Sequence, residues 1–183
     1  MGRVLRIAAA LAAAIAAVAI AGVPLYVLPA RDEPRAVDAV YVIGPPYDPR
    51  IEFAEGMIED GLAGALVVSI IDEPVQRAAL PEAADACDGA PRAYPVHCSQ
   101  PDPFTTRGEA RWLSDLATEH GWDSVAVITT TPHITRTRVI MERCWDGEIS
   151  YLDSGEPLGL AAWAYQYAYQ SAAFVKVAWE QGC

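Results

Sequence analysis

Residues 124–138, SVAVITTTPHITRTR, decide the fold class because they join two structural signals. The opening SVAVIT is a short β-rich apolar run, which is typical of a strand buried on both faces. From Pro132 the pattern predicts a helix that extends to Cys144, since proline is well suited to the first helical position. A buried strand that leads directly into a helix is the unit from which parallel α/β sheets are built.

The same alternation of apolar runs and helical patterns continues along the chain. Strands are predicted at residues 38–43, 65–71, 93–97, 124–129 and 148–152, and helices at residues 50–61, 74–86, 106–120, 132–144 and 158–180. Pro95 places the third strand at an edge of the sheet, and Pro81 interrupts the second helix. These elements predict an α/β fold: a doubly wound, mainly parallel sheet with helices on both faces, in a Rossmann-like three-layer sandwich.

The size and charge of the chain exclude several classes of protein. Its 183 residues suit one ordinary domain, and its apolar content of 52% excludes wholesale disorder. Acidic residues number 24 and basic residues 13, which gives a formal net charge of -11. Because nucleic-acid-binding surfaces are basic, no nucleic-acid partner is expected.

An uncharged segment precedes the predicted domain. Residues 7–28, IAAALAAAIAAVAIAGVPLYVL, number 22, which is enough to cross a hydrocarbon core of about 30 Å. Arg3 and Arg6 flank the segment on its amino-terminal side. The positive-inside rule therefore predicts one transmembrane helix in the plasma membrane, with the N-terminus in the cytoplasm and residues 31–183 outside. The lipid bilayer is the expected partner of this helix.

A cleaved signal peptide is the competing interpretation, and it would give a secreted protein. The tripeptide AIA at residues 19–21 offers a small-x-small cleavage site, but the apolar run continues beyond it to Leu28, which favours an uncleaved anchor. The expected organisation is a membrane anchor in residues 1–30, a polar linker in residues 31–37 and an extracytoplasmic α/β domain in residues 38–183.

The charges are divided unevenly between these parts. Residues 32–183 carry 24 acids and 10 bases, a formal charge of -14. An anionic membrane surface repels such a domain, which is therefore expected to stand off the bilayer.

Four cysteines lie outside the predicted anchor. An even number of cysteines in an extracytoplasmic domain favours disulfides. Cys87 and Cys98 enclose a proline-rich loop and are natural partners by proximity. That pairing would leave Cys144 with Cys183, although three pairings are possible in principle. The cysteines and histidines show no zinc-ligand spacing, so no metal site is predicted.

The fold indicates where functional residues should lie, because ligands of open α/β sheets bind beyond the carboxyl ends of the strands. Residues 129–138, TTTPHITRTR, leave a strand and open a helix at such a place. The amides and hydroxyls of Thr130 and Thr131 suit an anion. Arg136 and Arg138 add positive charge, and His133 suits a general acid or base. A structural interpretation also fits, in which Thr131 is a helix N-cap and the arginines are solvated.

Two further helix starts lie at the same predicted edge. Thr106 and Glu109 fit the S/T-x-x-E capping box, but the Glu109 carboxylate is also placed to face His133. Arg50 opens the first helix of the domain, where a cation is unfavourable for the helix dipole, and this indicates a ligand.

No G-x-G-x-x-G, Walker A or G-x-S-x-G motif occurs, so no cofactor is predicted.

The order of these features matches a known pattern. Asp38 opens an apolar strand, Arg50 starts a helix, Thr106-x-x-Glu109 starts another, and a later strand runs into T-T-x-x-H-x-x-R at residues 129–136. This order, over roughly residues 36–152, resembles the SanA/ElyC/YdcF-like bacterial envelope family. The chain departs from the family in two places. It has SII at residues 69–71 where the family usually has Ser-Gly-Gly, and its polar positions after Thr106 are Arg107 and Glu109 where the family often has Asn in a T-x-x-x-N helix start.

The resemblance implies a membrane-anchored α/β protein associated with envelope integrity and with peptidoglycan or lipid-carrier metabolism. By the same resemblance, the site residues are Arg50, Thr106, Glu109, Thr130, His133 and Arg136. We therefore expect a protein that binds or processes an anionic cell-wall or lipid-carrier precursor, as a hydrolase or transferase would. The arginines would hold a phosphate or carboxylate, and Glu109 and His133 would move protons.

A non-catalytic envelope scaffold that recruits cell-wall machinery is the main alternative. It would use its acidic surface and an aromatic stripe on the last helix, formed by Trp163, Tyr165, Tyr167, Tyr169, Phe174 and Trp179. Aromatic residues at helical spacing more often belong to the core, which is the expectation here. A metal-dependent phosphatase that uses Asp48, Asp72 or Glu73 as oxygen ligands is a third and weaker interpretation.

Overall fold

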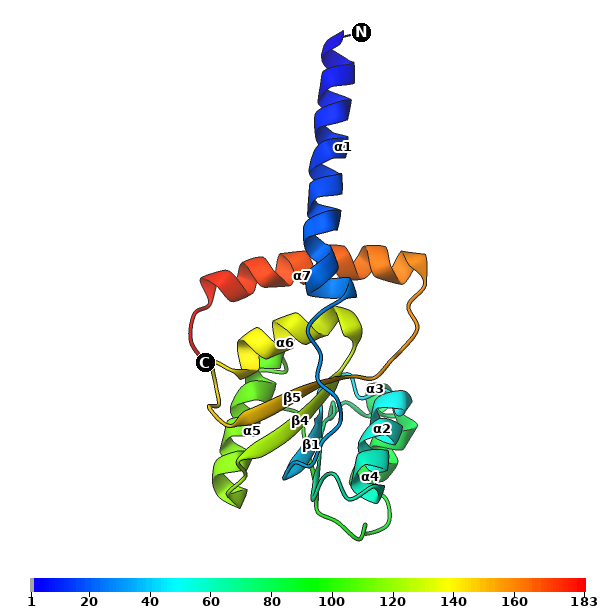
Figure 1. The fold of residues 1–183 in the computed structure, drawn as a ribbon. Helices are drawn as coiled ribbons and strands as arrows, with labels where there is room; N and C mark the ends of the chain where they lie inside the picture. Colours follow the sequence, from blue (N-terminus) through cyan, green and yellow to red (C-terminus); the bar gives the residue numbers. More distant parts are fainter. Residues whose placement is uncertain (1) are drawn as a thin grey trace.

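Five short strands form one parallel sheet, and the central strands are the most apolar. The computed structural model describes residues 2–183, and its strands follow the spatial order β3-β2-β1-β4-β5 (Figure 1). Their bounds are β1 Ala39–Val42, β2 Leu66–Ser69, β3 Val96–Ser99, β4 Ser124–Thr129 and β5 Glu148–Asp153. Every neighbouring pair is parallel, so the predicted α/β fold with a parallel sheet is confirmed.

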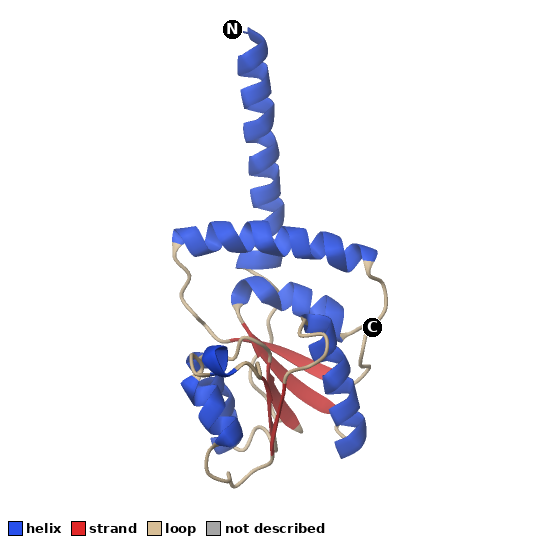
Figure 2. Cartoon of the chain, turned by 180° about the vertical axis from the view of Figure 1, so that it is seen from behind, coloured by secondary structure: helices blue, strands red, loops and turns tan. Residues whose placement is uncertain are grey.

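Helices cover both faces of this sheet (Figures 1 and 2). Successive residues of a strand point to opposite faces, and the two faces therefore bury separate apolar cores. On one face Tyr41 packs with α5 (Thr106–His120) and α6 (Ile134–Met141). On the other face Val40 packs with α2 (Asp48–Glu59) and α4 (Pro81–Asp88). The predicted three-layer, doubly wound arrangement is thus confirmed.

Two predicted elements differ locally from the structure. The helix expected over residues 74–86 is two helices, α3 (Pro74–Arg77) and α4, and Pro81 begins the second of them. The third strand lies slightly later than expected and begins at Val96, although the Pro95 carbonyl before it already accepts a hydrogen bond from the Leu66 amide. As predicted, β3 lies at an edge of the sheet.

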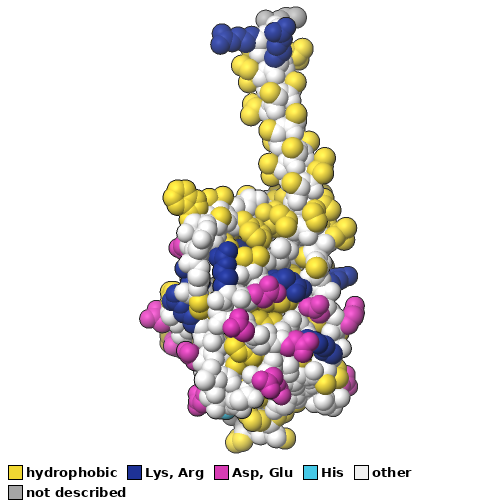
Figure 3. All heavy atoms as spheres, turned by 60° about the vertical axis from the view of Figure 1, so that its left-hand side comes forward, with side chains coloured by type: hydrophobic (Ala, Val, Ile, Leu, Met, Phe, Trp, Pro, Cys, Tyr) yellow, Lys and Arg dark blue, Asp and Glu magenta, His cyan; other side chains and the backbone are white. Residues whose placement is uncertain are grey.

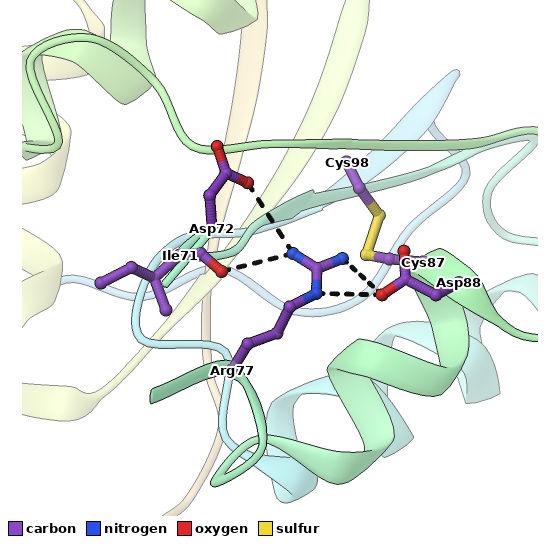
Figure 4. The surroundings of a disulfide bond; sticks show 6 residues. All are labelled: Ile71, Asp72, Arg77, Cys87, Asp88 and Cys98. Carbon is purple, nitrogen blue, oxygen red and sulfur yellow. Dashed lines mark hydrogen bonds and ion pairs between the residues drawn. A yellow bond between two sulfur atoms is a disulfide. The ribbon is translucent and has the colours of Figure 1, made fainter. Parts of the chain in front are cut away.

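All four cysteines form disulfides, in the pairing that proximity favours. Cys87 joins Cys98 between α4 and β3, and Cys144 joins Cys183, which ties the end of the chain to the end of α6. Figure 4 shows the first disulfide beside Arg77, whose guanidinium bonds Asp88 and the Ile71 carbonyl. Disulfides of this kind fit an extracytoplasmic domain.

The N-terminal segment is a helix that projects from the body as a stalk (Figure 1). The α-helix α1 (Gly2–Gly22) continues into the π-helix η1 (Val23–Val27). Together they form one apolar stretch of 26 residues that could cross a membrane. By length and position this helix fits either a membrane anchor or a signal sequence.

The segment expected to be a linker is bonded along β5. The Asp32 amide donates to the Tyr151 carbonyl at 2.9 Å. The Arg31 guanidinium lies 3.0 Å from an oxygen of Asp153, and Arg35 donates to the Ser150 hydroxyl. These bonds hold the body close to the base of the N-terminal helix.

The last helix, α7 (Leu160–Trp179), crosses the base of this stalk (Figures 1 and 2). The rings of Tyr26 and Tyr167 meet edge to face at 5.1 Å between centroids, and the Tyr167 hydroxyl donates to the Ala19 carbonyl at 3.2 Å. Gly22 permits this approach, because a Cβ at that position would lie only 2.4 Å from the Tyr167 ring. The end of the stalk is therefore part of the folded body.

Candidate functional site

A cavity of about 800 Å³ lies at the carboxyl edge of β1 and β4, under α7. This is where an open parallel sheet is expected to bind its ligand. The residues that the sequence predicted for the site and that line this cavity are Arg50, Thr106, Glu109, Thr130, His133 and Arg136. The structure thus brings together side chains from three separate helix starts.

The start of α5 differs from the predicted capping box by one residue. The N-cap is Thr105, whose hydroxyl accepts a hydrogen bond from the Gly108 amide at 3.3 Å. Glu109 is consequently one position too late to close a capping box, and that interpretation is wrong. Gly108 explains this register, because a Cβ there would lie 1.9 Å from the Pro103 carbonyl oxygen. The Thr106 hydroxyl and the Glu109 carboxyl are therefore directed into the cavity region rather than used in the cap.

Glu109 is a buried carboxyl whose pKa is shifted toward neutrality. One of its oxygens accepts a hydrogen bond from the Gly44 amide at 2.7 Å. Burial raises the pKa of Glu109 to about 7, against the opposing effects of the Gly44 amide, the Ser69 hydroxyl and the two cavity arginines. At neutral pH both its protonated and its ionised forms are populated, which is the property required of a general acid or base.

His133 is held between two threonine hydroxyls. Its Nδ1 lies 2.9 Å from the Thr129 hydroxyl, and its Nε2 lies 3.4 Å from the Thr106 hydroxyl. Burial, together with the positive charges of Arg136 and Arg50, lowers the pKa of His133 well below its usual value. The ring is therefore neutral at neutral pH, with one nitrogen as a hydrogen-bond donor and the other as an acceptor.

Arg136 is a buried cation with neutral partners. Only 8% of the residue is exposed, and its Nε donates to Gln170 at 2.8 Å while Nη1 donates to the Thr106 hydroxyl at 3.3 Å. Its guanidinium also lies 5.7 Å from the centre of the Tyr169 ring. Among the residues that the structure describes, 2–183, no carboxylate forms an ion pair with Arg136.

Arg50 lines the same cavity but is neutralised within the protein. Its Nε lies 2.5 Å from an oxygen of Glu156, and Nη1 donates to the Pro45 carbonyl at 2.7 Å. The unfavourable position of a cation at the start of α2 is thus explained by Glu156, which follows β5. The prediction that a ligand explains this position is therefore wrong, because the internal carboxylate is sufficient.

Two predicted anion-binding residues lie elsewhere. The Thr131 hydroxyl donates to Asp153 at 2.7 Å, so it is neither a helix N-cap nor directed into the cavity. Arg138 bonds Asp32 and the Ala30 carbonyl, and its guanidinium covers the Tyr151 ring at 4.2 Å. Arg138 therefore holds the segment before β1 in place and does not line the cavity.

The predicted oxygen ligands of a metal-dependent phosphatase do not converge. Asp72 lies 3.9 Å from Arg77 (Figure 4), and Glu73 caps α3 by accepting hydrogen bonds from the Val75 and Gln76 amides. Over residues 2–183 no group of three or more His, Cys, Asp or Glu side chains is arranged to hold a metal ion. The geometry gives no support to that interpretation.

Gln170 and Glu156 are the site residues that sequence reasoning missed. Glu156 lies in an irregular loop and has no spacing that relates it to Arg50. Gln170 is buried, and its amide donates to Gln166 one turn earlier at 3.0 Å. Two glutamines four residues apart on a mainly apolar helix were the available signal for a polar contact beneath α7.

Comparison with known proteins identified no relative of this chain. No family model matches the chain, and no curated protein or solved structure matches it. The chemistry of the cavity therefore carries the functional argument.

Proposed function

We propose that this chain is a SanA/ElyC/YdcF-like envelope protein that binds and processes an anionic cell-wall or lipid-carrier precursor in the cavity under α7. The observation that carries the proposal is the buried Arg136, whose partners are the neutral side chains of Gln170 and Thr106. A buried charge is costly unless a counter-charge accompanies it. A phosphate or carboxylate in the cavity supplies that counter-charge, and the arginine fork suits either group.

The neighbouring groups supply proton transfer. Glu109, with a pKa of about 7, donates or accepts a proton near neutral pH. His133 would accept one when a bound anion offsets the charges of Arg136 and Arg50 that lower its pKa. The Thr106 hydroxyl contacts both His133 and Arg136, so an anion bound at Arg136 also changes the electrostatic environment of the imidazole. Hydrolysis of the precursor, or transfer of a group from it, would use Arg136 to hold the anion and Glu109 and His133 to move protons beside it.

The proposal includes a membrane orientation. Arg3 and Arg6 at the amino end favour a cytoplasmic N-terminus, and the two disulfides favour an oxidising compartment for the body. Secretion after cleavage near residues 19–21 is the alternative. The bond from Tyr167 to the Ala19 carbonyl supports an uncleaved anchor, because cleavage after residue 21 would remove Ala19 from the protein.

Two variants separate binding from conversion. With a panel of polyprenyl phosphates and cell-wall fragments, Arg136→Ala is expected to weaken binding of an anionic probe by roughly 1.5–3 kcal/mol, the usual contribution of hydrogen bonds to charged groups. His133→Ala is expected to lower conversion by about 10²–10⁴-fold and to affect binding less. Arg138→Ala removes a cation from the same helix outside the cavity and serves as the control. Equal effects of Arg136→Ala and Arg138→Ala on binding would reject the site.

A non-catalytic scaffold is the second candidate, and the exposed aromatic residues of α7 favour it. Tyr165, Tyr169 and Trp179 are exposed, so the expectation that the aromatic stripe belongs to the core is wrong for these three. A scaffold would retain its effect on the cell envelope when His133 is replaced. Loss of envelope function in a well-folded His133→Ala variant would favour the enzyme.

A further inference from the structure

The outer face of α7 is apolar and has no covering element. Lys176 is the only charged residue in Leu160–Trp179. At 100° per residue the exposed side chains of Leu160, Val175 and Trp179 fall on one half of the helix, and Trp179 is 85% exposed. The buried Gln170 and Val177 lie on the opposite half, toward the cavity and the core. An uncovered apolar face of this length needs an apolar or interfacial environment.

The contacts of Tyr167 and Tyr26 show at which level of the N-terminal helix α7 lies. Tyr167 bonds the carbonyl of Ala19, and Tyr26 contacts Ser171. At 1.5 Å per residue, the uncharged α-helix from Ile7 reaches about 18 Å by Ala19 and about 22 Å by Gly22, where the π-helix η1 begins. Since the hydrocarbon core of a bilayer is about 30 Å thick, a helix that spans from Ile7 places the contacts of α7 in the last ~12 Å of the core on the side of the body, where interfacial helices bury their apolar faces.

The direction and composition of α7 agree with this depth. The helix runs crosswise to α1 (Figures 1 and 2), so it lies along the plane of a membrane that α1 crosses. Tyrosine and tryptophan are the residues that concentrate at membrane interfaces. In Figure 3 apolar side chains gather at the end of the body from which the stalk emerges, and the charged side chains lie farther away.

We propose that α7 is an interfacial membrane helix, whose outer face lies in the headgroup layer of the same bilayer that α1 crosses. The occupant of this face is lipid, because the stalk brings the bilayer to it and no segment of residues 2–183 covers it. With a single lysine on the helix, attachment depends on apolar area rather than on anionic lipid. The body then lies against the membrane, although its charge alone predicted that it would stand off.

This inference does not depend on the proposed function, but it bears on access to the cavity. Tyr169 and Gln170 of α7 line the cavity that contains Arg136. One helix, about 10 Å across, therefore separates the cavity from the level of the headgroups. An anion attached to a lipid is presented close to this site without leaving the membrane.

Photo-crosslinking of the full chain tests the proposal. In phosphatidylcholine vesicles, Ala168→benzoylphenylalanine puts a crosslinker on the exposed face of α7, and Ala79→benzoylphenylalanine puts one at an exposed alanine between α3 and α4. Irradiation is expected to add the mass of one lipid to the Ala168 variant in a several-fold larger fraction than to the Ala79 variant. Equal yields would overturn the proposal, and so would crosslinking of Ala168 mainly to a second copy of the chain.

Fluorescence quenching gives a second measurement that needs no crosslinker. In a Trp163→Phe background, which leaves Trp179 as the tryptophan of α7, lipids brominated near the headgroup end of the acyl chain are expected to quench the fluorescence, and Trp179→Phe is expected to remove most of that quenching. Trp122→Phe, at the amino edge of β4, is the matched control and is expected to retain it. Unchanged quenching in the Trp179→Phe protein would contradict the proposal whether or not the cavity binds an anion.

Discussion

Replacing Glu109 by glutamine should change how the stability of the protein depends on pH. The glutamine keeps an oxygen that can accept the Gly44 amide hydrogen bond, and it removes the titrating proton. In the wild type, burial raises the pKa of Glu109 from 4.5 to about 7. The folded chain therefore holds this proton more tightly than the unfolded chain does, and the Glu109 contribution to the free energy of unfolding falls as pH rises from about 4.5 to about 7.

The size of the effect follows from that shift. A pKa raised from 4.5 to about 7 corresponds to about 3 kcal/mol. His133 acts in the other direction, because its lowered pKa makes its contribution fall as pH drops below about 6.5. Both proteins contain His133, so the difference between their free energies of unfolding isolates Glu109. Relative to wild type, Glu109→Gln should be more stable at pH 8 than at pH 4.5 by about 3 kcal/mol.

Urea unfolding of the full chain in detergent, followed by near-ultraviolet circular dichroism, measures this difference at the two pH values. Near-ultraviolet dichroism reports the aromatic packing of the body, which contains the cavity. If the difference between the two proteins were the same at pH 4.5 and pH 8, Glu109 would titrate normally in the folded protein. The assignment of Glu109 as an acid or base at neutral pH would then fail.

Three further predictions concern the cap, the orientation and the disulfides. Thr105→Ala should destabilise the protein by about 1 kcal/mol in urea unfolding, the usual cost of losing a helix N-cap, and no change would contradict the cap seen at α5. A reporter that is active only outside the cytoplasm, fused after Cys183, should be active, and a silent fusion would reject the proposed orientation. Denatured, unreduced protein should show no free thiols on alkylation, and four free thiols would contradict the two disulfides.

Much of the fold could be predicted because its signals are local. The four central residues of the SVAVIT run, 125–128, are all apolar, so burial of the strand on both faces could be predicted directly. The position of the cavity followed from the rule for the carboxyl ends of parallel strands, and the structure places Glu109, His133 and Arg136 there together. The roles proposed for these residues remain predictions.

The cap of α5, the partner of Arg50 and the exposure of α7 depend on tertiary contacts that have no local sequence signal. Thr105 and Thr106 are equally good N-caps, and the close approach of Gly108 to Pro103 determines which one caps α5. Glu156 reaches Arg50 across more than half of the chain. The exposure of α7 was missed because aromatic spacing looks the same on a core helix and on an interfacial helix.

The central claim is that Arg136 is a buried cation whose counter-ion is a bound ligand. The most direct test compares the unfolding temperatures of wild type and Arg136→Met as undecaprenyl phosphate is added to the full chain in detergent. Ligand at about 100 times the wild-type Kd should stabilise the wild type by about 2.7 kcal/mol. Because loss of the guanidinium is expected to weaken binding by roughly 1.5–3 kcal/mol, the same ligand concentration should stabilise the methionine variant by only about 0.3–1.3 kcal/mol. Equal stabilisation of the two proteins would contradict the claim, because the ligand would then bind without Arg136.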